Sequence, residues 1–248
     1  MRSVAVGSGV ASADPAPRAV ATAAVTTLSV YRFDGFWAKA WAFCQMGWAH
    51  LAMRRQKGIR FYKLMGTGTG EGFDPKPNWS TYAILTVWET REDAEIGLQK
   101  APFTTWAAKA VETTRFFMQP VQVWGDTWSG DNPFGRPEKP KADDLPTPMA
   151  VLTRATIKFS KMREFWSNVP DINPDIRSAE GKMTYKIGLG EVPLLHQVTF
   201  SIWNDIDAVR HFAYRAPAHA EAIKAATTGD GFFKDSLFVR FKLLEERH

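Results

Sequence analysis

The sequence predicts an α+β fold made of two tandem ferredoxin-like halves, the architecture of a dimeric α/β barrel contained in one chain. Strand and helix patterns follow the order β-α-β-β-α-β twice, which is the ferredoxin-like order. Segment 84–110 also resembles segment 199–225. Two pairs of residues match at the same spacing between these segments, Trp88 with Trp203 and Pro102 with Pro217. A segment rich in Pro, Gly and charged residues separates the two copies, as expected of a linker.

The first half is predicted to cover residues 26–125. β-Branched and aromatic runs bounded by Gly, Asn or Asp predict strands at 27–33, 59–65, 81–88 and 115–124. Apolar residues at helical spacing predict helices over 35–55 and 91–112, with a break at Pro102. Cys44 lies in the apolar stretch of the first helix, which favours a buried position.

The second half is predicted to cover residues 149–248, after a linker at 126–148. Strands are expected at 150–158, 182–187, 198–203 and 237–244, and helices at 161–169 and 206–226. Asp205 is a candidate N-cap for the last helix, and Pro217 should kink it. Residues 1–25 are rich in Ala, Val, Ser, Gly and Pro without a periodic apolar face, which predicts a disordered tail.

Composition narrows the range of functions. The 248 residues are 45% hydrophobic and include 10 Trp and 17 Phe, enough for a large core and for an apolar ligand or cofactor. The net charge of +5 comes from scattered Lys and Arg, which argues against nucleic-acid binding and favours weak attraction to an anionic membrane surface. No apolar run is long enough for a transmembrane helix. The single cysteine fits a reducing cytoplasm.

Few chemical motifs stand out. The five histidines form no zinc-binding spacing. The glycine stretch 66–72 leads into another strand and not into a helix, so we interpret it as a turn and not as a phosphate cradle. His219 follows Pro217 among small alanines, where a flat group could lie close to the helix, and Thr104 occupies its place in the first copy. A lone helical histidine is most often a surface or core residue, so these residues alone leave both interpretations open.

Several long and unusual segments then point to one family. They read KLMGTGTGEGFDPKPNW (63–79), PMAVLTRATIKF (148–159), YKIGLGEVP (185–193), QVTFSIW (197–203) and LFVRFKLL (237–244). In these segments, which occur in order over most of residues 27–244, the chain resembles the spheroidene monooxygenases, the acyclic carotenoid 2-ketolases of purple bacteria. Segment APAHAEAI (216–223) resembles the family segment that carries a histidine, here His219.

The resemblance implies a haem b enzyme that uses O2 and reduced ferredoxin to insert a keto group at C-2 of an acyclic carotenoid. Two hydroxylations at one carbon would give a geminal diol, which loses water to form the ketone. His219 is then expected to bind the iron. Candidates for the remaining haem contacts are Arg215, Phe212 and Trp203, and candidates for oxygen or propionate contacts are Arg240, Lys186 and Arg154.

Two other functions stay open from the sequence. One is a haem enzyme of the same fold with dehydratase or peroxidase-like chemistry on another small apolar molecule, because one fold hosts many activities. The other is a non-enzymatic carrier of haem or of an apolar ligand. In each case the expected location is the cytoplasm, with peripheral contact with the inner membrane as an alternative.

Overall fold

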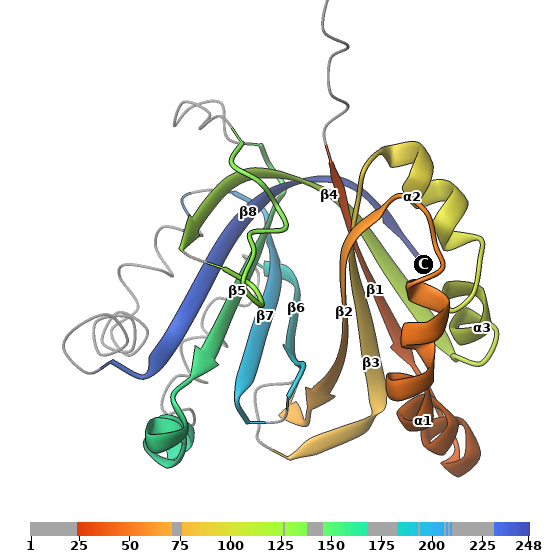
Figure 1. The fold of residues 1–248 in the computed structure, drawn as a ribbon, viewed down its shortest axis with the longest axis horizontal. Helices are drawn as coiled ribbons and strands as arrows, with labels where there is room; N and C mark the ends of the chain where they lie inside the picture. Colours follow the sequence, from red (N-terminus) through yellow and green to blue (C-terminus); the bar gives the residue numbers. More distant parts are fainter. Residues whose placement is uncertain are drawn as a thin grey trace, which may run out of the picture.

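Eight antiparallel strands form a closed barrel in this computed structural model, in the order β1-β3-β2-β6-β7-β5-β8-β4 (Figure 1). The structure describes residues 24–70, 76–125, 127–137, 146–167, 183–192, 194–205, 207, 209 and 231–248. The strands are β1 Val25–Arg32, β2 Ile59–Gly68, β3 Pro77–Trp88, β4 Glu112–Gly125, β5 Met149–Ile157, β6 Met183–Gly190, β7 His196–Trp203 and β8 Phe233–Arg247. The helices are α1 Phe36–Met53, α2 Arg91–Leu98, α3 Phe103–Ala107 and the short 3-10 helix η3 Phe159–Lys161. The predicted α+β class and barrel are therefore present.

The order of the first four strands around the barrel is repeated by the last four. The first set runs β4-β1-β3-β2 and the second runs β8-β5-β7-β6. Trp88, at the end of β3, pairs with Val25 of β1, and Trp203, at the end of β7, pairs with Met149 of β5. The two sets meet along a long β4–β8 ladder and a short β2–β6 ladder that begins at Gly66. Both junctions are antiparallel and together close the barrel, and the β2–β6 junction consists of two residue pairs, Gly66 with Gly190 and Thr67 with Leu189.

The barrel interior is a packed apolar core to which all eight strands contribute. Its members alternate with outward-facing residues along each strand, as the two-residue period of a strand requires. The inward set includes Leu28, Met65, Leu85, Phe116, Leu152, Ile187, Phe200 and Val239. Phe116 and Phe200 meet with ring centroids 5.3 Å apart. Because side chains fill this interior, the barrel is a core and not a channel.

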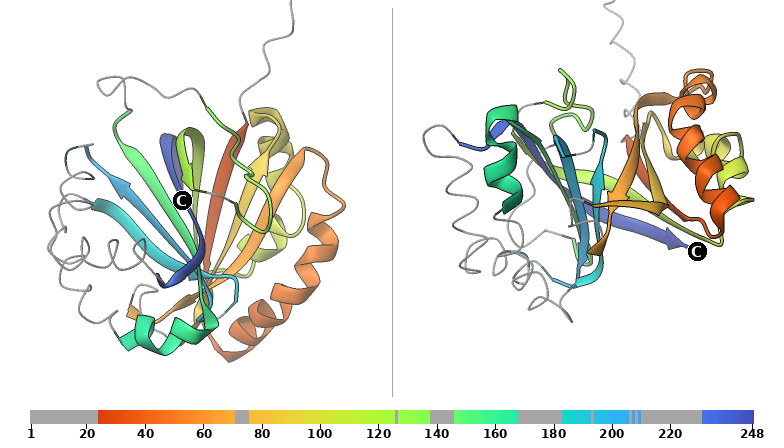
Figure 2. Two further views of the ribbon diagram at one scale, coloured as in Figure 1. Left: turned by 60° about the vertical axis from the view of Figure 1, so that its left-hand side comes forward. Right: turned by 90° about the horizontal axis from the view of Figure 1, so that it is seen from below.

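A second core lies between β1–β4 and the helices outside them. Figure 2 shows α1, α2 and α3 on the outer side of these strands. The largest fully buried side chains of this layer are aromatic, namely Tyr31, Phe33, Trp88, Phe103, Trp106 and Phe117. The break predicted at Pro102 is confirmed, since α2 ends at Leu98 and α3 begins after Pro102.

The orientation of α1 corrects one prediction. Its buried residues are Ala42, Ala49 and Met53. Trp37 and Trp48 are 83% and 69% exposed, and Cys44, predicted to be buried, is exposed. The helix is apolar on nearly every side, so its pattern could not indicate which face packs on the sheet. The small alanines face inward because they allow a close approach to the strands.

Part of the predicted linker belongs to the core. Trp128 and Phe134, within residues 126–148, are buried against the barrel interior. The Trp128 ring lies 5.4 Å from Phe61 of β2, and its indole Nε1 donates to Glu191. This segment therefore covers part of the barrel as well as connecting β4 with β5.

Several predicted boundaries also shift. β1 begins at Val25, inside the segment predicted as the tail, and Ala24 packs against the barrel core. β3 begins at Pro77, four residues before the start of the predicted strand 81–88. β2 and β6 run on to Gly68 and Gly190, through glycines predicted to end them. In the described part of the chain, no helix has the length and apolar character needed to cross a membrane.

Candidate functional site

One row of side chains crosses the outer face of the strands from β6 to β4. Lys186 pairs with Ser201, Ser201 with Val151, Val151 with Arg240, and Arg240 with Gln122. Residues directly opposite one another in antiparallel strands project from the same face. The neighbours of these residues along each strand line the barrel interior, so the row itself faces outward. Two of the predicted site residues, Lys186 and Arg240, therefore share one face.

Arg240 is held in a fixed orientation on this face. Its guanidinium Nη1 donates to Gln122 Oε1 over 3.1 Å. The guanidinium carbon also lies 5.0 Å from the ring centroid of Trp124 and 5.7 Å from that of Phe238. The residue is only 9% exposed. These contacts hold the positive charge of the guanidinium at a constant position on the outer face.

Apolar side chains lie near these two cations on the outer face. Met149, Val151, Trp203 and Val209 form a buried cluster, with Met183 and Phe238 packed against it. Trp203, predicted to contact a cofactor, belongs to this cluster, and its indole Nε1 donates to Ser201 Oγ over 2.8 Å. An apolar surface with Lys186 and Arg240 along it fits a flat apolar group that carries anionic arms, which is the chemistry of haem and its propionates.

The corresponding row on the first four strands carries no charge. Tyr62 pairs with Thr86, Thr86 with Thr27, and Thr27 with Phe117. Trp88 closes the row, since its indole Nε1 donates to Thr27 Oγ1 over 2.9 Å. The cationic row is thus a property of the second set of strands, in which the candidate site was predicted.

The repeated Tyr-Lys pair is not equivalent in the two sets. Segment YKLMGTG (62–68) resembles YKIGLG (185–190), which aligns Tyr62 with Tyr185 and Lys63 with Lys186, but strand pairing places Lys186 where Tyr62 lies. Lys63 points into the barrel and binds Glu191 at 2.5 Å, whereas Lys186 faces outward. A shift of one residue moves every side chain to the opposite face of a strand. The sequence resemblance and the strand pairing therefore differ by one position at this pair.

Arg154, the third predicted cation, lies apart from the other two. It pairs with Val198 and Leu237, which line the barrel interior, so it projects inward. Its guanidinium forms an ion pair with Asp235. Burial lowers the pKa of Arg154, and the carboxylate of Glu191 acts in the opposite direction. Lys186 and Arg240 thus face outward, and Arg154 belongs to a polar cluster at the barrel interior.

The remaining candidates are on the predicted helix 206–226. His219, Phe212 and Arg215 lie outside the described residues. Of the described histidines, His50 contacts Tyr62, with Nδ1 and the hydroxyl oxygen 3.1 Å apart, and burial lowers the pKa of His196. Within the described ranges, no three His, Cys, Asp or Glu side chains are grouped so as to hold a metal ion.

The comparisons with known proteins bear on this site. No family model matches the chain. The chain is 42% identical over 221 residues to a protein of Rhodobacter capsulatus named spheroidene monooxygenase, covering 89% of this chain and 90% of that protein. It is 41% identical to the Cereibacter sphaeroides protein of the same name, covering 88% of this chain and 66% of that protein. A crystal structure of aldoxime dehydratase is similar in fold, with a TM-score of 0.59 and 12% identity over 90% of this chain and 82% of that one.

Proposed function

The chain belongs to the spheroidene monooxygenase family, and we propose that it inserts a keto group at C-2 of an acyclic carotenoid in a haem-dependent reaction. Membership of this family supports the assignment of the chain as a monooxygenase, a class of oxidoreductase. The proposal for the substrate rests on the name of these relatives. The single observation in the structure that supports the proposed cofactor is the outer row with Lys186 and Arg240 on an apolar surface.

We place the proposed haem on this outer face of β5–β8. His219 is the proposed iron ligand, by its resemblance to the family segment, and Arg215 and Phe212 are proposed neighbours. Lys186 and Arg240 would bind propionates or an oxygen atom, and Trp203 would contact the ring. When bound, haem supplies the activation of O2, with reduced ferredoxin as the proposed electron donor.

The chain itself has two tasks in this proposal. The apolar cluster around Met149 and Trp203 keeps water from the reacting carbon, since an apolar surface has few groups to hold it. Arg240, fixed by Gln122 and two aromatic rings, holds a positive charge at a constant position. A positioned charge stabilises developing negative charge without rearranging during the reaction.

We also propose that the barrel consists of two ferredoxin-like halves produced by duplication. The repeated strand order and the equivalent positions of Trp88 and Trp203 support this proposal. After duplication, the first copy would have filled its outer face with α1, α2 and α3, and the second would have kept a cationic face for a ligand.

The test is expression of the full chain in a cell that accumulates spheroidene, followed by analysis of the pigments. We expect a pigment with an added carbonyl, and we expect purified protein to need both O2 and a reductant for turnover. His219→Ala is the matched variant and should yield unmodified pigment. Unchanged pigment in cells that contain folded, haem-loaded wild-type protein would contradict the proposed function.

A further inference from the structure

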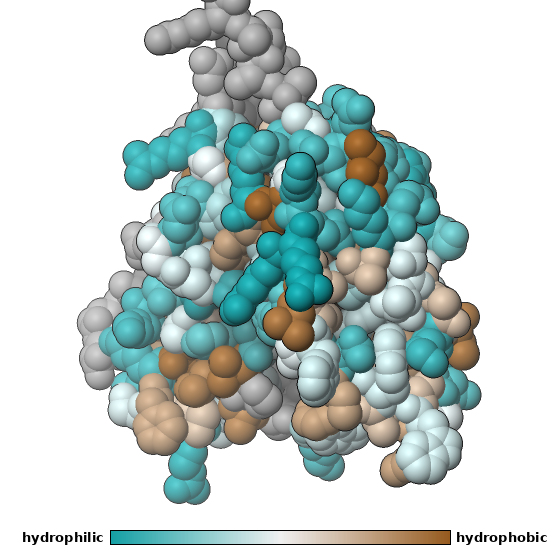
Figure 3. All heavy atoms as spheres, turned by 45° about the vertical axis from the view of Figure 1, so that its right-hand side comes forward, coloured by the Kyte–Doolittle hydropathy of each residue, from teal (hydrophilic) through white to brown (hydrophobic). Residues whose placement is uncertain are grey.

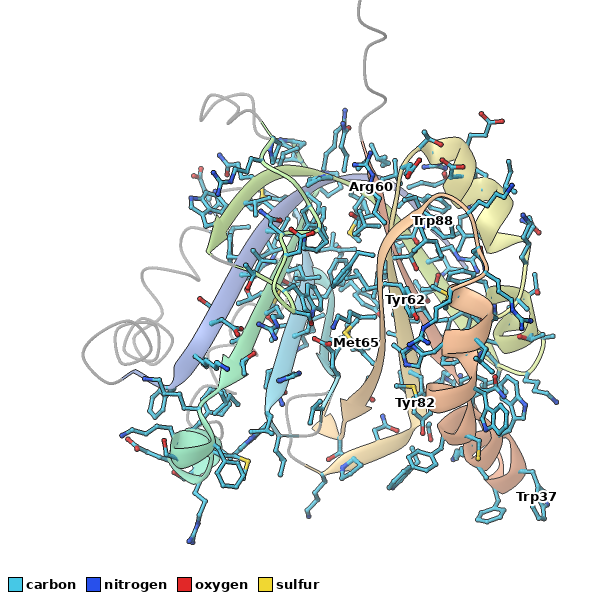
Figure 4. All side chains as sticks on the ribbon, viewed as in Figure 1. Trp37, Arg60, Tyr62, Met65, Tyr82 and Trp88 are labelled. Atoms are coloured by element: carbon cyan, nitrogen blue, oxygen red, sulfur yellow. The ribbon has the colours of Figure 1, made fainter. Side chains whose placement is uncertain are left out.

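The outward face of α1 is the most apolar exposed surface of the described helices. Trp37 is 83% exposed and Phe36 is 75% exposed at its N-terminal end, and Trp48 and Leu51 are exposed about three to four turns later. Figure 4 shows Trp37 pointing away from the barrel at the end of α1. The lower part of the face seen in Figure 3 is mainly near-white to brown, whereas teal predominates above it.

The exposed residues of α1 form one continuous arc. Each residue turns the helix by about 100°. Viewed down the helix axis, the exposed residues therefore occupy an arc of roughly 140°, with Phe43 at one edge and Trp48 at the other. This arc also contains Ala40, Gly47 and Cys44, and it carries no polar side chain between Phe36 and Leu51. On the opposite side, Ala42, Ala49 and Met53 are buried against the sheet. An apolar face of this width, directed away from the core, is typical of a surface that binds another apolar medium.

The apolar surface continues beyond the helix. The ring of Phe43 meets that of Trp79 edge to face, with centroids 5.2 Å apart, and Trp79 is 53% exposed on β3. The helix and the start of β3 therefore present their aromatic side chains together.

Most charges beside this surface are positive. Residues 35–70 contain Lys39, Arg54, Arg55, Lys57, Arg60 and Lys63 and no Asp or Glu, and the exposed Asp34, one residue before them, pairs with Lys39 at 3.4 Å. Arg54, Arg55, Lys57 and Arg60 are exposed just beyond the C-terminal end of α1. Basic residues flanking an aromatic face complement the phosphates of an anionic bilayer.

We propose that this aromatic face of α1 binds the surface of an anionic bilayer, with the helix lying in the plane of the headgroups. Trp, Phe and Leu would enter the boundary between headgroups and acyl chains, and the arginines would contact lipid phosphates. A second copy of the chain is the other occupant that this surface could bind, and the test below distinguishes it from a bilayer. The inference is independent of the proposed function, since it uses neither the outer row of β5–β8 nor a bound cofactor.

The test is flotation of the full-length protein with vesicles of phosphatidylcholine alone or mixed with phosphatidylglycerol. We expect the protein to float with the mixed vesicles. Replacing Trp37 and Trp48 together by Ser should weaken this binding by about tenfold or more. Phe159→Ser is the matched control, because Phe159 is 78% exposed on η3, away from α1, and its loss should leave binding unchanged. Thermal melting followed by circular dichroism verifies that each variant is folded.

A charge variant separates the aromatic contribution from the electrostatic one. Replacing Arg54 and Arg55 together by Gln should weaken binding to mixed vesicles by roughly tenfold and leave binding to neutral vesicles unchanged. The proposal is overturned if the wild-type protein does not float with mixed vesicles, or if the Trp37 and Trp48 substitutions do not alter flotation. It is also overturned if light scattering shows a dimer that those substitutions dissociate and that does not bind vesicles.

Discussion

The two arginines of the candidate region differ in the partners that hold them. Arg154 faces the barrel interior, where the carboxylate of Asp235 compensates its charge. Arg240 faces outward and is held by the amide of Gln122 and by aromatic rings. A buried arginine is costly to leave without its carboxylate partner, because its charge would then be buried unpaired. The strand register thus places the two arginines on opposite faces of the barrel wall.

Asp235→Asn should destabilise the fold. The side chain of Arg154 is 3% exposed and that of Asp235 is 27% exposed, so the substitution would leave a buried charge without its counter-ion. We expect a loss of about 3 kcal/mol in the free energy of unfolding, measured by urea denaturation. Glu112→Gln breaks the exposed pair with Arg32 and should cost about 0.5 kcal/mol or less. Equal losses for the two substitutions would show that Asp235 does not compensate a buried charge.

At the scale of elements, a cluster of charges joins α2 to the end of β8. Arg247 of β8 donates to both oxygens of Glu95 on α2, at 2.8 Å each, and also binds Glu245. Arg91 of α2 contacts the same two carboxylates. Both guanidinium groups lie over the ring of Phe117, with centroid distances of 3.9 Å for Arg91 and 4.4 Å for Arg247. The helix outside the first four strands is therefore attached to the last strand of the chain.

This cluster should make stability depend on pH in the acid range. Hydrogen bonds from Arg247, and then from Arg91, lower the pKa of Glu245 from 4.5 to about 2. A carboxylate with a lowered pKa stabilises the fold above its unfolded pKa, and this contribution disappears as the pH falls through the folded pKa. Between pH 4.5 and about 2, the melting temperature of the wild type should therefore approach that of Arg247→Gln.

The measurement is thermal melting of both proteins at several pH values and at low salt, because salt weakens exposed charge pairs. We expect the wild type to melt higher near neutral pH and the two curves to converge near pH 2. Arg32→Gln removes a separate exposed pair with Glu112 and serves as the control. A difference between wild type and Arg247→Gln that does not change with pH would mean that these carboxylates do not contribute.

Strands and helices with a regular apolar pattern could be predicted from the sequence. The side of each element that faces the core was harder to predict. β3 and β7 emerged as corresponding strands because their aromatic and β-branched runs end in Trp88 and Trp203. The buried side of α1 did not emerge, because apolar residues surround that helix. Trp128 was missed as a core residue because prolines and glycines around it suggest a linker. Lys186 and Arg240 were predicted as candidates for oxygen or propionate contacts. Only the register of the strands shows that they lie in one row on the same face.

At the scale of the whole molecule, the two sides of the barrel serve different purposes. Apolar side chains from every strand pack together in the interior and form the core of the barrel. The outer face of the first four strands is covered by α1–α3 and their aromatic core. The outer face of the last four strands combines an apolar cluster with Lys186 and Arg240. Among the described surfaces, that face is therefore the one on which we propose that the cofactor binds.

A haem titration of the purified full-length protein, followed by its Soret absorbance, tests this placement most directly. We expect the wild type to bind haem, and both His219→Ala and Arg240→Gln to bind it about tenfold or more weakly. Arg115→Gln is the matched control, because Arg115 is an arginine on the first four strands. It lies on β4 opposite Ser29 of β1, and its Nε donates to Ser29 Oγ over 3.0 Å. Its haem affinity should equal that of the wild type. Wild-type affinity in both His219→Ala and Arg240→Gln would contradict a haem site on the outer face of the last four strands.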